Sequence, residues 1–247
     1  MVQTREAIED QIGCGDAMPA APPPPANGRV QMAEKYDGIP EGLEAGPTSP
    51  AKRVVDVAAC GTAVAILWPV FALAALLIRL DSPGPGLLRQ KRVGLGGNTF
   101  DFFKFRTMHY HRTKHDLWDR LPLGDLRQRL LSPRGRPKNA TAIGWALRKT
   151  TVDELPQLLN VIRGDMSVVG PRPDIPEIVE HWPPPFRQRH LVNPGMTGHA
   201  QVNGRSDITH YEKIRRDLEY VRRHPMSRDM RILWNTLSLV LSKKGAR

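Results

Sequence analysis

The sequence predicts a mainly helical α/β protein, in which a re-entrant membrane helix hairpin precedes a compact core with a small β-hairpin and interfacial helices. Three observations predict it: an uncharged apolar run over residues 57–78, two short strand patterns around a glycine-rich turn, and helical patterns that continue to the C-terminus. With 247 residues, the chain has room for one domain of ordinary size. We expect a disordered tail over residues 1–50, a re-entrant membrane helix over 51–80 and a cytoplasmic domain over 81–247.

The composition indicates which kinds of molecule the protein binds. The 36 Lys and Arg outnumber the 25 Asp and Glu, which gives a formal charge of +11 and favours a phosphorylated substrate, a membrane surface or nucleic acid. Aromatic residues make up only 6% of the chain, so a stacking platform for single strands is poorly supplied. The tail is rich in Pro, Gly and Ala without a hydrophobic period, which is typical of disorder.

The apolar run over residues 57–78 is the strongest element signal. As one straight helix it would be about 33 Å long, enough to cross a bilayer core of about 30 Å. Pro69 lies near its middle and should kink the helix, because proline lacks an N–H and clashes with the preceding turn. Both flanks are basic, and positive residues stay on the cytoplasmic side. The flanking charges are Lys52 and Arg53 before the run, and Arg79, Arg89, Lys91 and Arg92 after it. A segment that enters and returns on one side fits both features, and a kinked spanning helix or a buried core helix remains as an alternative.

A β-hairpin should follow the membrane segment. Residues 86–92 and 100–105 have strand patterns, and Gly94-Leu95-Gly96-Gly97-Asn98 between them supplies the positive-φ residues of a turn. No helical pattern follows these glycines, so a phosphate-binding loop is disfavoured.

Helices and glycine-rich loops should make up the rest of the core. A helix is predicted from Asp153 to Arg163, with Gly164 as its C-cap and Pro156 in its first turn. Residues 168–173 and 193–205 have the composition of compact turns and loops. The two last helical patterns cover residues 211–223 and 230–241. The second of these carries Trp234, so it either lies on a membrane surface or packs as an ordinary C-terminal helix.

Asp153 and Glu154 are the acids with the most chemical promise. Their ordinary role would be structural, because acids favour helix N-termini and Thr151 with Glu154 matches a capping box. Nearby basic residues favour a catalytic role instead. Arg148 is close to the acids in sequence, and Arg172 and Arg205 lie in glycine- and proline-rich loops that allow a ligand to approach the backbone closely. Carboxylates that face guanidinium groups suit phosphoryl transfer, in which an acid attacks phosphorus or holds a metal while the cations neutralise phosphate oxygens.

A set of short motifs runs in a fixed order through the chain. Each is weak alone, and the ordered set is specific. The motifs are Lys52-Arg53-Val54-Val55-Asp56, Phe103-Lys104-Phe105-Arg106-Thr107-Met108, Asp153-Glu154-Leu155-Pro156-Gln157-Leu158, Asn160-Val161-Ile162-Arg163-Gly164-Asp165-Met166-Ser167, Val169-Gly170-Pro171-Arg172-Pro173, Pro194-Gly195-Met196-Thr197-Gly198 and Gln201-Val202-Asn203-Gly204-Arg205. From about Lys52 to the C-terminus the chain resembles the bacterial sugar transferases, the monotopic phosphoglycosyl transferases that start polysaccharide and glycoconjugate assembly.

The resemblance implies a mechanism and a site. Asp153 would attack the sugar-proximal phosphorus of a UDP-sugar and expel UMP, and polyprenyl phosphate (undecaprenyl phosphate) would then take the phospho-sugar. Glu154, with Asp153, would bind Mg²⁺ or help activate the attacking groups. The nucleotide or the transferring phosphate would be bound by Arg148, Arg172, Arg205, Lys104 and Arg106. The family breaks its membrane helix at a Ser-Pro pair, and here the pair is Trp68-Pro69, so the proline is kept and the serine is replaced.

The resemblance also implies partners and location. We expect a UDP-sugar donor, a polyprenyl phosphate acceptor and membrane lipids, no nucleic acid, and a homodimer as one candidate assembly. The active site would lie at the cytoplasmic face of the bacterial inner membrane, which makes residues 81–247 the catalytic domain. Two other functions remain open at this point: a non-catalytic scaffold for an assembly complex, and a membrane-tethered basic protein that binds lipid or nucleic acid.

Overall fold

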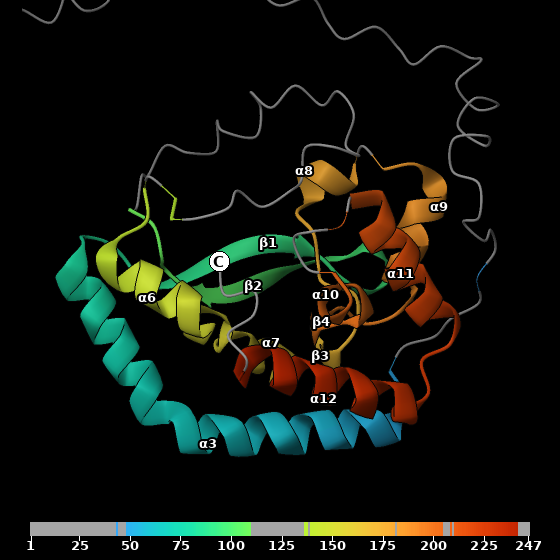
Figure 1. Cartoon of the computed structure of the whole chain (residues 1–247), viewed down its shortest axis with the longest axis horizontal. Coiled ribbons are helices and arrows are strands. Elements are labelled where there is room, and N and C mark those ends of the chain that lie inside the picture. The colour runs from blue at the N-terminus through green and yellow to red at the C-terminus, as the bar shows by residue number, and fades with distance from the viewer. Residues whose placement is uncertain are drawn as a thin grey trace, which may run out of the picture. The chain divides into compact units, whose positions relative to one another are not determined.

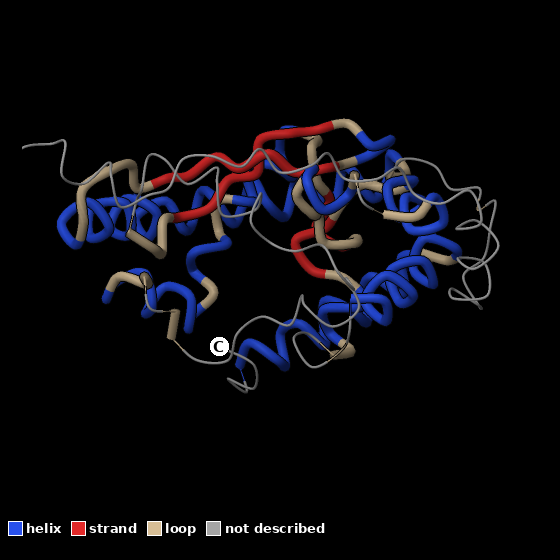
Figure 2. The backbone as a smooth tube through the Cα atoms, turned by 90° about the horizontal axis from the view of Figure 1, so that it is seen from above, coloured by secondary structure: helices blue, strands red, loops and turns tan. Residues whose placement is uncertain are grey.

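The computed structural model describes residues 43, 48–109, 136–137, 139–180, 182–204, 208 and 210–241. They belong to one compact unit, Ile39–Arg247. The unit is mainly helical, with two separate two-stranded sheets, which confirms the predicted α/β class. Figure 2 shows the two sheets as separate pairs of strands. The predicted tail lies almost wholly outside the described residues.

The first described helix, α3 (Pro50–Asp81), holds the whole apolar run. Ser49 caps it by accepting from the Lys52 N–H at 3.3 Å. Figure 1 shows α3 as two arms that meet at a sharp bend. Pro69 lies inside the helix, and we attribute the bend to it, because a sharp kink of a helix is almost always at proline or a comparable interruption. The described residues include this one helix long and apolar enough to cross a membrane.

The two arms of α3 contact different parts of the core. Cys60, Ala63 and Val64 of residues 50–68 pack with residues of α7 (Gln157–Arg163). Ala74 and Ile78 of residues 69–81 pack against Phe105. Away from these contacts, large apolar side chains of α3 are exposed. They are Val54, Val55, Ile66, Trp68, Val70, Leu73, Leu76 and Leu80.

The predicted hairpin is confirmed as β1 (Leu87–Val93) and β2 (Thr99–Phe105), which pair antiparallel. Gly96 and Gly97 in the turn have φ angles of 65° and 83°, the region that glycine adopts without strain. Opposite residues of an antiparallel pair lie on the same face, so Arg92, paired with Phe100, shares a face with Lys104, paired with Leu88.

The segment around the two acids differs from the predicted helix. Helix α6 (Ala142–Thr150) ends at Thr151, which has a left-handed φ of 61°. A 3-10 turn, η2 (Val152–Glu154), follows, and α7 begins only at Gln157. The capping box is therefore wrong, because an N-cap residue needs an extended backbone that Thr151 does not have. The predicted C-cap is confirmed: Gly164 has a φ of 97° and donates to Asn160 O and Val161 O.

The two predicted loops contain a small parallel sheet of β3 (Ser167–Val169) and β4 (Gly195–Thr197). Glycine is required where the loops cross, because a Cβ on Gly195 would lie 2.0 Å from the Gly170 nitrogen. Four short helical segments complete this part. They are α8 (Pro176–Val179), α9 (Pro184–Arg187), η3 (Gln188–Leu191) and α10 (His199–Val202).

The last two helices are α11 (His210–Arg222) and α12 (Met226–Leu241), so the second begins four residues before its predicted start. Figure 1 shows α12 along the first arm of α3. A buried polar network joins the two: Lys52 Nζ lies 2.7 Å from Asp229 Oδ2, and the Tyr220 hydroxyl donates to Asp229 Oδ1 at 2.8 Å. Asp56 accepts from the Ser167 hydroxyl at 2.6 Å. Lys52, taken from the sequence as a flanking charge, is thus an interior residue that is 7% exposed.

Candidate active site

The two acids lie where three elements converge. Turn η2 carries Asp153 and Glu154, and both α6 and β2 contact it. The turn is held in place through α7, because buried Asn160 accepts from the Phe103 N–H at 3.0 Å and donates to Asp101 O at 2.6 Å. The Asn160 side chain therefore ties α7, and with it the preceding turn, to the main chain of the hairpin.

Glu154 and Arg172 form a two-pronged ion pair. Arg172 Nη2 donates to Glu154 Oε1 at 2.6 Å, and Nη1 donates to Oε2 at 3.1 Å. The parallel geometry is the strong form of an arginine–carboxylate contact. Burial alone would raise the pKa of Glu154, but the charge and hydrogen bonds of Arg172 outweigh it and hold this pKa below its usual range. Glu154 is therefore a permanent anion at neutral pH.

Asp153 has the opposite electrostatic environment. Burial, with the adjacent charge of Glu154, raises its pKa to about 6, although Arg148, Lys104 and Arg172 act to lower it. Two neighbouring carboxyl groups whose pKa values are pushed apart can take different roles. Asp153 is ionised above pH 6 and is more basic than an ordinary aspartate, which suits a nucleophile.

Cations surround the acid pair. Burial, followed by the charges of Arg92 and Arg172, lowers the pKa of Lys104 to about 8. Arg92 and Arg172 both lie over the Phe102 ring, at 5.3 and 6.0 Å from its centroid. Arg92 was not predicted from sequence, where it was counted as a flanking charge. Its shared strand face with Lys104 is the signal that finds it.

The predicted site residues divide into three groups. Asp153, Glu154, Lys104, Arg148 and Arg172 lie together, with Arg148 in the last turn of α6. Arg106 does not join them: it is 1% exposed and donates to Pro83 O, to Ser82 O at 2.6 Å and to Ile78 O at 3.0 Å. Arg106 therefore ties the end of α3 to the hairpin. Arg205 lies outside the described residues.

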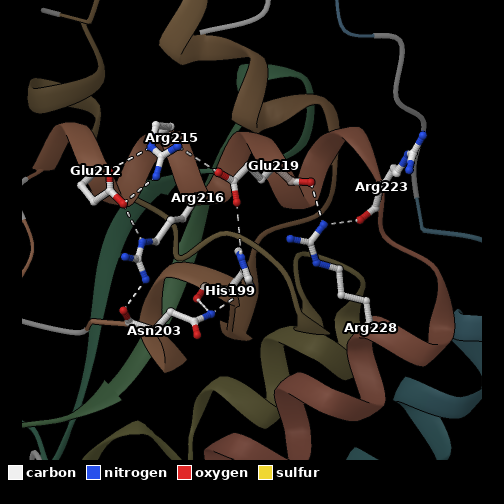
Figure 3. Close-up of polar contacts among 8 residues, drawn as sticks. All are labelled: His199, Asn203, Glu212, Arg215, Arg216, Glu219, Arg223 and Arg228. Carbon is white, nitrogen blue, oxygen red and sulfur yellow. Dashed lines mark hydrogen bonds and ion pairs between the residues drawn. The ribbon is translucent and has the colours of Figure 1, made fainter. Parts of the chain in front are cut away.

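The described chain just before Arg205 is held by an ion-pair network on α10 and α11 (Figure 3). Arg216 donates to Asn203 O and pairs with Glu212 at 2.9 Å. His199 Nε2 lies 3.6 Å from Glu219 Oε2, and the Asn203 amide donates to His199 O at 2.9 Å. The network fixes the main chain two residues before Arg205.

The acid pair suits Mg²⁺ only when a substrate supplies the other ligands. Among the described residues no group of three or more His, Cys, Asp or Glu is arranged to hold a metal ion. Mg²⁺ is commonly bound by one or two carboxylates together with substrate phosphates. Asp153 and Glu154 fit that requirement, provided that the diphosphate of a substrate supplies other ligands.

Comparison with known protein families places the chain in a family. Residues 47–243 match the model of the family described as "Bacterial sugar transferase". The match covers the long apolar helix α3, the hairpin, the acid pair and both glycine-rich loops.

Three relatives illustrate the range of matching proteins. The chain is 39% identical over 203 residues to a UDP-glucose:undecaprenyl-phosphate glucose-1-phosphate transferase of Caulobacter vibrioides, covering 79% of this chain and 71% of that protein. It is 35% identical over 203 residues to a UDP-N-acetylgalactosamine-undecaprenyl-phosphate N-acetylgalactosaminephosphotransferase of Aeromonas hydrophila, covering 79% of this chain and 45% of that protein. It is 38% identical to the exopolysaccharide production protein PSS of Rhizobium leguminosarum bv. phaseoli, covering 78% of this chain and 96% of that protein.

Proposed function

The chain belongs to the bacterial sugar transferase family, and we propose that it transfers a sugar-1-phosphate from a UDP-sugar to undecaprenyl phosphate with release of UMP. The transfer would initiate the assembly of an exopolysaccharide or a related glycoconjugate. The observation that carries the proposal is the site itself: a basic aspartate, Asp153, lies beside a fixed Glu154–Arg172 pair and near Lys104 and Arg148. Relatives named for this reaction with two different UDP-sugars support it.

The first step is a displacement at phosphorus. A carboxylate oxygen of Asp153 forms a bond to the sugar-proximal phosphorus of the donor, and the bond from that phosphorus to the bridging oxygen breaks. UMP leaves with the bonding electrons, and the phospho-sugar remains as an acyl phosphate on Asp153. Arg172, Lys104 and Arg148 stabilise the negative charge on the phosphate oxygens, which is the main protein contribution in phosphoryl transfer.

The second step regenerates the carboxylate. A phosphate oxygen of undecaprenyl phosphate attacks the same phosphorus, the acyl phosphate bond breaks, and a lipid-linked diphosphate sugar leaves. Lys104 is well suited to both steps, because its pKa of about 8 keeps it charged at neutral pH and no acid among the described residues forms an ion pair with it. Mg²⁺ would be held by Glu154 and Asp153 with the donor diphosphate, where it supplies neutralisation of the leaving group's charge.

A re-entrant α3 brings a lipid phosphate to this site. Both ends of the helix are bound to the same core: Arg53 donates to Ile162 O at 2.8 Å, and Asp81 accepts from the Ile143 N–H at 3.1 Å. A straight helix of 32 residues would separate these ends by about 48 Å. The bend at Pro69 shortens that separation and lets both ends contact the same core, which supports entry and return on one side of the membrane.

Helix α12 offers a second apolar face. Met226, Met230, Trp234 and Leu237 are all exposed and recur at helical spacing. Such a stripe is typical of a helix that lies in the headgroup region. Together with the basic residues that flank the apolar run, this stripe supports a catalytic core at the cytoplasmic face of the inner membrane.

The test of the reaction is a burst assay. Purified protein is mixed with Mg²⁺ and each of a panel of UDP-sugars, first without and then with undecaprenyl phosphate. Without lipid, we expect one UMP per protein and an intact-mass gain equal to one phospho-sugar. With lipid, turnover should continue. Variant D153N should show neither burst nor mass gain, whereas D101N, which removes a carboxylate paired with Lys91 on the hairpin, should keep both. A burst in D153N would refute the covalent step.

The test of topology uses cysteines placed on either side of α3. Variants A51C and P85C, both at exposed positions, are made in a chain whose Cys14 and Cys60 are replaced by alanine. Re-entry predicts that neither cysteine reacts with an impermeant maleimide in intact spheroplasts and that both react after lysis. Reaction of one cysteine in intact spheroplasts would favour a spanning helix.

A further inference from the structure

The loop that carries Arg172 is fixed along its main chain by a second arginine. Arg189 of η3 donates from Nη2 to Arg172 O at 2.8 Å. The same guanidinium reaches Asp174, the loop residue two positions later, where Nη1 donates to Oδ2 at 2.5 Å. Arg172 is therefore held at both ends: its side chain by Glu154 and its backbone by Arg189.

Arg189 is itself held rigidly. It is 5% exposed, and its Nη2 also pairs at 2.6 Å with Asp217 of α11, which is 3% exposed. Its guanidinium lies 5.0 Å from the centroid of the Trp182 ring. A buried charge with two carboxylates, a carbonyl and an aromatic face has few other positions to adopt, so the contact with Arg172 O is well defined.

The hairpin holds the same loop from the other side. Arg92 Nη1 donates to Pro173 O at 3.2 Å, and the Val93 N–H donates to Asp174 O at 2.9 Å. The carbonyls of three successive residues, 172 to 174, each accept a hydrogen bond from outside the loop. Buried carbonyls of any loop need donors, but here two of the three donors are guanidinium groups that are themselves held in place, so the main chain that carries the Arg172 guanidinium has little freedom to move.

We propose that Arg189, held by Asp217, is a positioning residue that sets the main chain of Arg172 for phosphate transfer. The inference deepens the proposed function and rests on it. Arg189 touches no reacting atom: it acts through Arg172, whose guanidinium faces both Glu154 and the transferring phosphate. A displacement of about 1 Å in a group of this kind costs about 100-fold in rate, and loss of a supporting contact commonly costs about 10- to 100-fold.

A double-mutant cycle separates positioning from stability. Variant R189Q should lower the turnover number about 10- to 100-fold in the wild-type chain. In an R172A chain there is no guanidinium to position, so R189Q should change the remaining rate less than about twofold, although its effect on melting temperature should persist. R187Q is the matched control, because Arg187 is an exposed arginine two residues away that donates to Glu180 O. Equal rate losses in both backgrounds, or no loss in the wild-type chain, would overturn the proposal.

A second readout does not depend on activity. Amide hydrogen exchange should accelerate over residues 168–174 in R189Q and in the milder D217N, and should be unchanged in R187Q. Unchanged exchange in R189Q would also overturn the proposal. If the wild-type protein released no UMP from any donor, the proposed function would fail while the exchange result still decided whether Arg189 fixes this loop.

Discussion

The buried pair of Lys52 and Asp229 yields a quantitative prediction about stability. The two charges lie 2.7 Å apart, and their side chains are only 9% and 3% exposed. Variant K52M removes one charge and keeps a long apolar stem. It leaves Asp229 buried with the Tyr220 hydroxyl as its partner, and it also removes the 3.7 Å contact of Lys52 with Asp56, which keeps the Ser167 hydroxyl. Removal of one member of a buried pair costs about 3–5 kcal/mol, because the other charge is left uncompensated.

An exposed pair provides the control. Lys91 and Asp101 lie 2.9 Å apart, almost the same distance, but their side chains are 63% and 35% exposed. Water screens such a pair, so K91M should cost at most about 1 kcal/mol. The two variants differ in burial and share the chemistry of the substitution.

The assay is thermal unfolding of detergent-solubilised protein at fixed detergent, salt and pH. For a domain of this size, 1 kcal/mol corresponds to about 2–4 °C, so K52M should lower the melting temperature by about 6–20 °C and K91M by at most about 4 °C. Variant K52M/D229N, which removes both charges, should recover part of the loss. Equal shifts for K52M and K91M would refute the reasoning that burial sets the strength of this contact.

Four further predictions test the site, the crossing of the two loops and the bend. Because Asp153 attacks as the carboxylate and has a pKa of about 6, the burst rate should rise about tenfold per pH unit up to pH 6 and then level off; a rate that is flat between pH 5 and 7 would contradict this role. Folding raises this pKa above 3.8, so the ionised carboxyl destabilises the fold above pH 6, and D153N should raise the melting temperature at pH 8 by more than at pH 5. G195A should sharply reduce the yield of folded protein, because its Cβ would lie 2.0 Å from the Gly170 nitrogen. G61A places a Cβ with nothing within 4 Å, so in thermal unfolding it should be neutral or stabilise the protein by up to about 1 kcal/mol. P69A should straighten α3 and expose one of the two flanking cysteines to maleimide in intact spheroplasts; labelling as in the parent would show that packing alone sets the bend.

The features that sequence predicted well are those set by local chemistry. Gly96 and Gly97 supply the positive φ angles of the hairpin turn, and Gly164 ends α7 in the left-handed region. Asp153, Glu154 and Arg172 converge as the motifs indicated. In each case a residue type is tied to a backbone conformation or a charge, so a short stretch of sequence carries the information.

The features that sequence did not predict depend on contacts between distant segments. Lys52 precedes an apolar run, so the sequence predicts a charge that flanks a membrane segment. Nothing near it in sequence indicates that its partner is Asp229, at the other end of the chain. Arg106 is two residues after Lys104 and would share its face if β2 continued, but the strand ends at Phe105 and the side chain turns toward the end of α3. Arg189 lies outside all of the sequence motifs, and only the contact between η3 and the loop at Arg172 indicates its role.

The packing of α3 against α7 links the apolar helix to the candidate site. Cys60 of α3 packs in one cluster with Leu158 and Val161 of α7. Arg53 caps the C-terminal carbonyls of the same helix, and turn η2 with Asp153 immediately precedes it. Because α7 spans only seven residues, or about 10 Å, the depth of Asp153 relative to the apolar helix is set by one short rigid element. If α3 enters the membrane as proposed, this contact holds Asp153 near the headgroup region, where both a soluble sugar donor and a lipid phosphate can reach it.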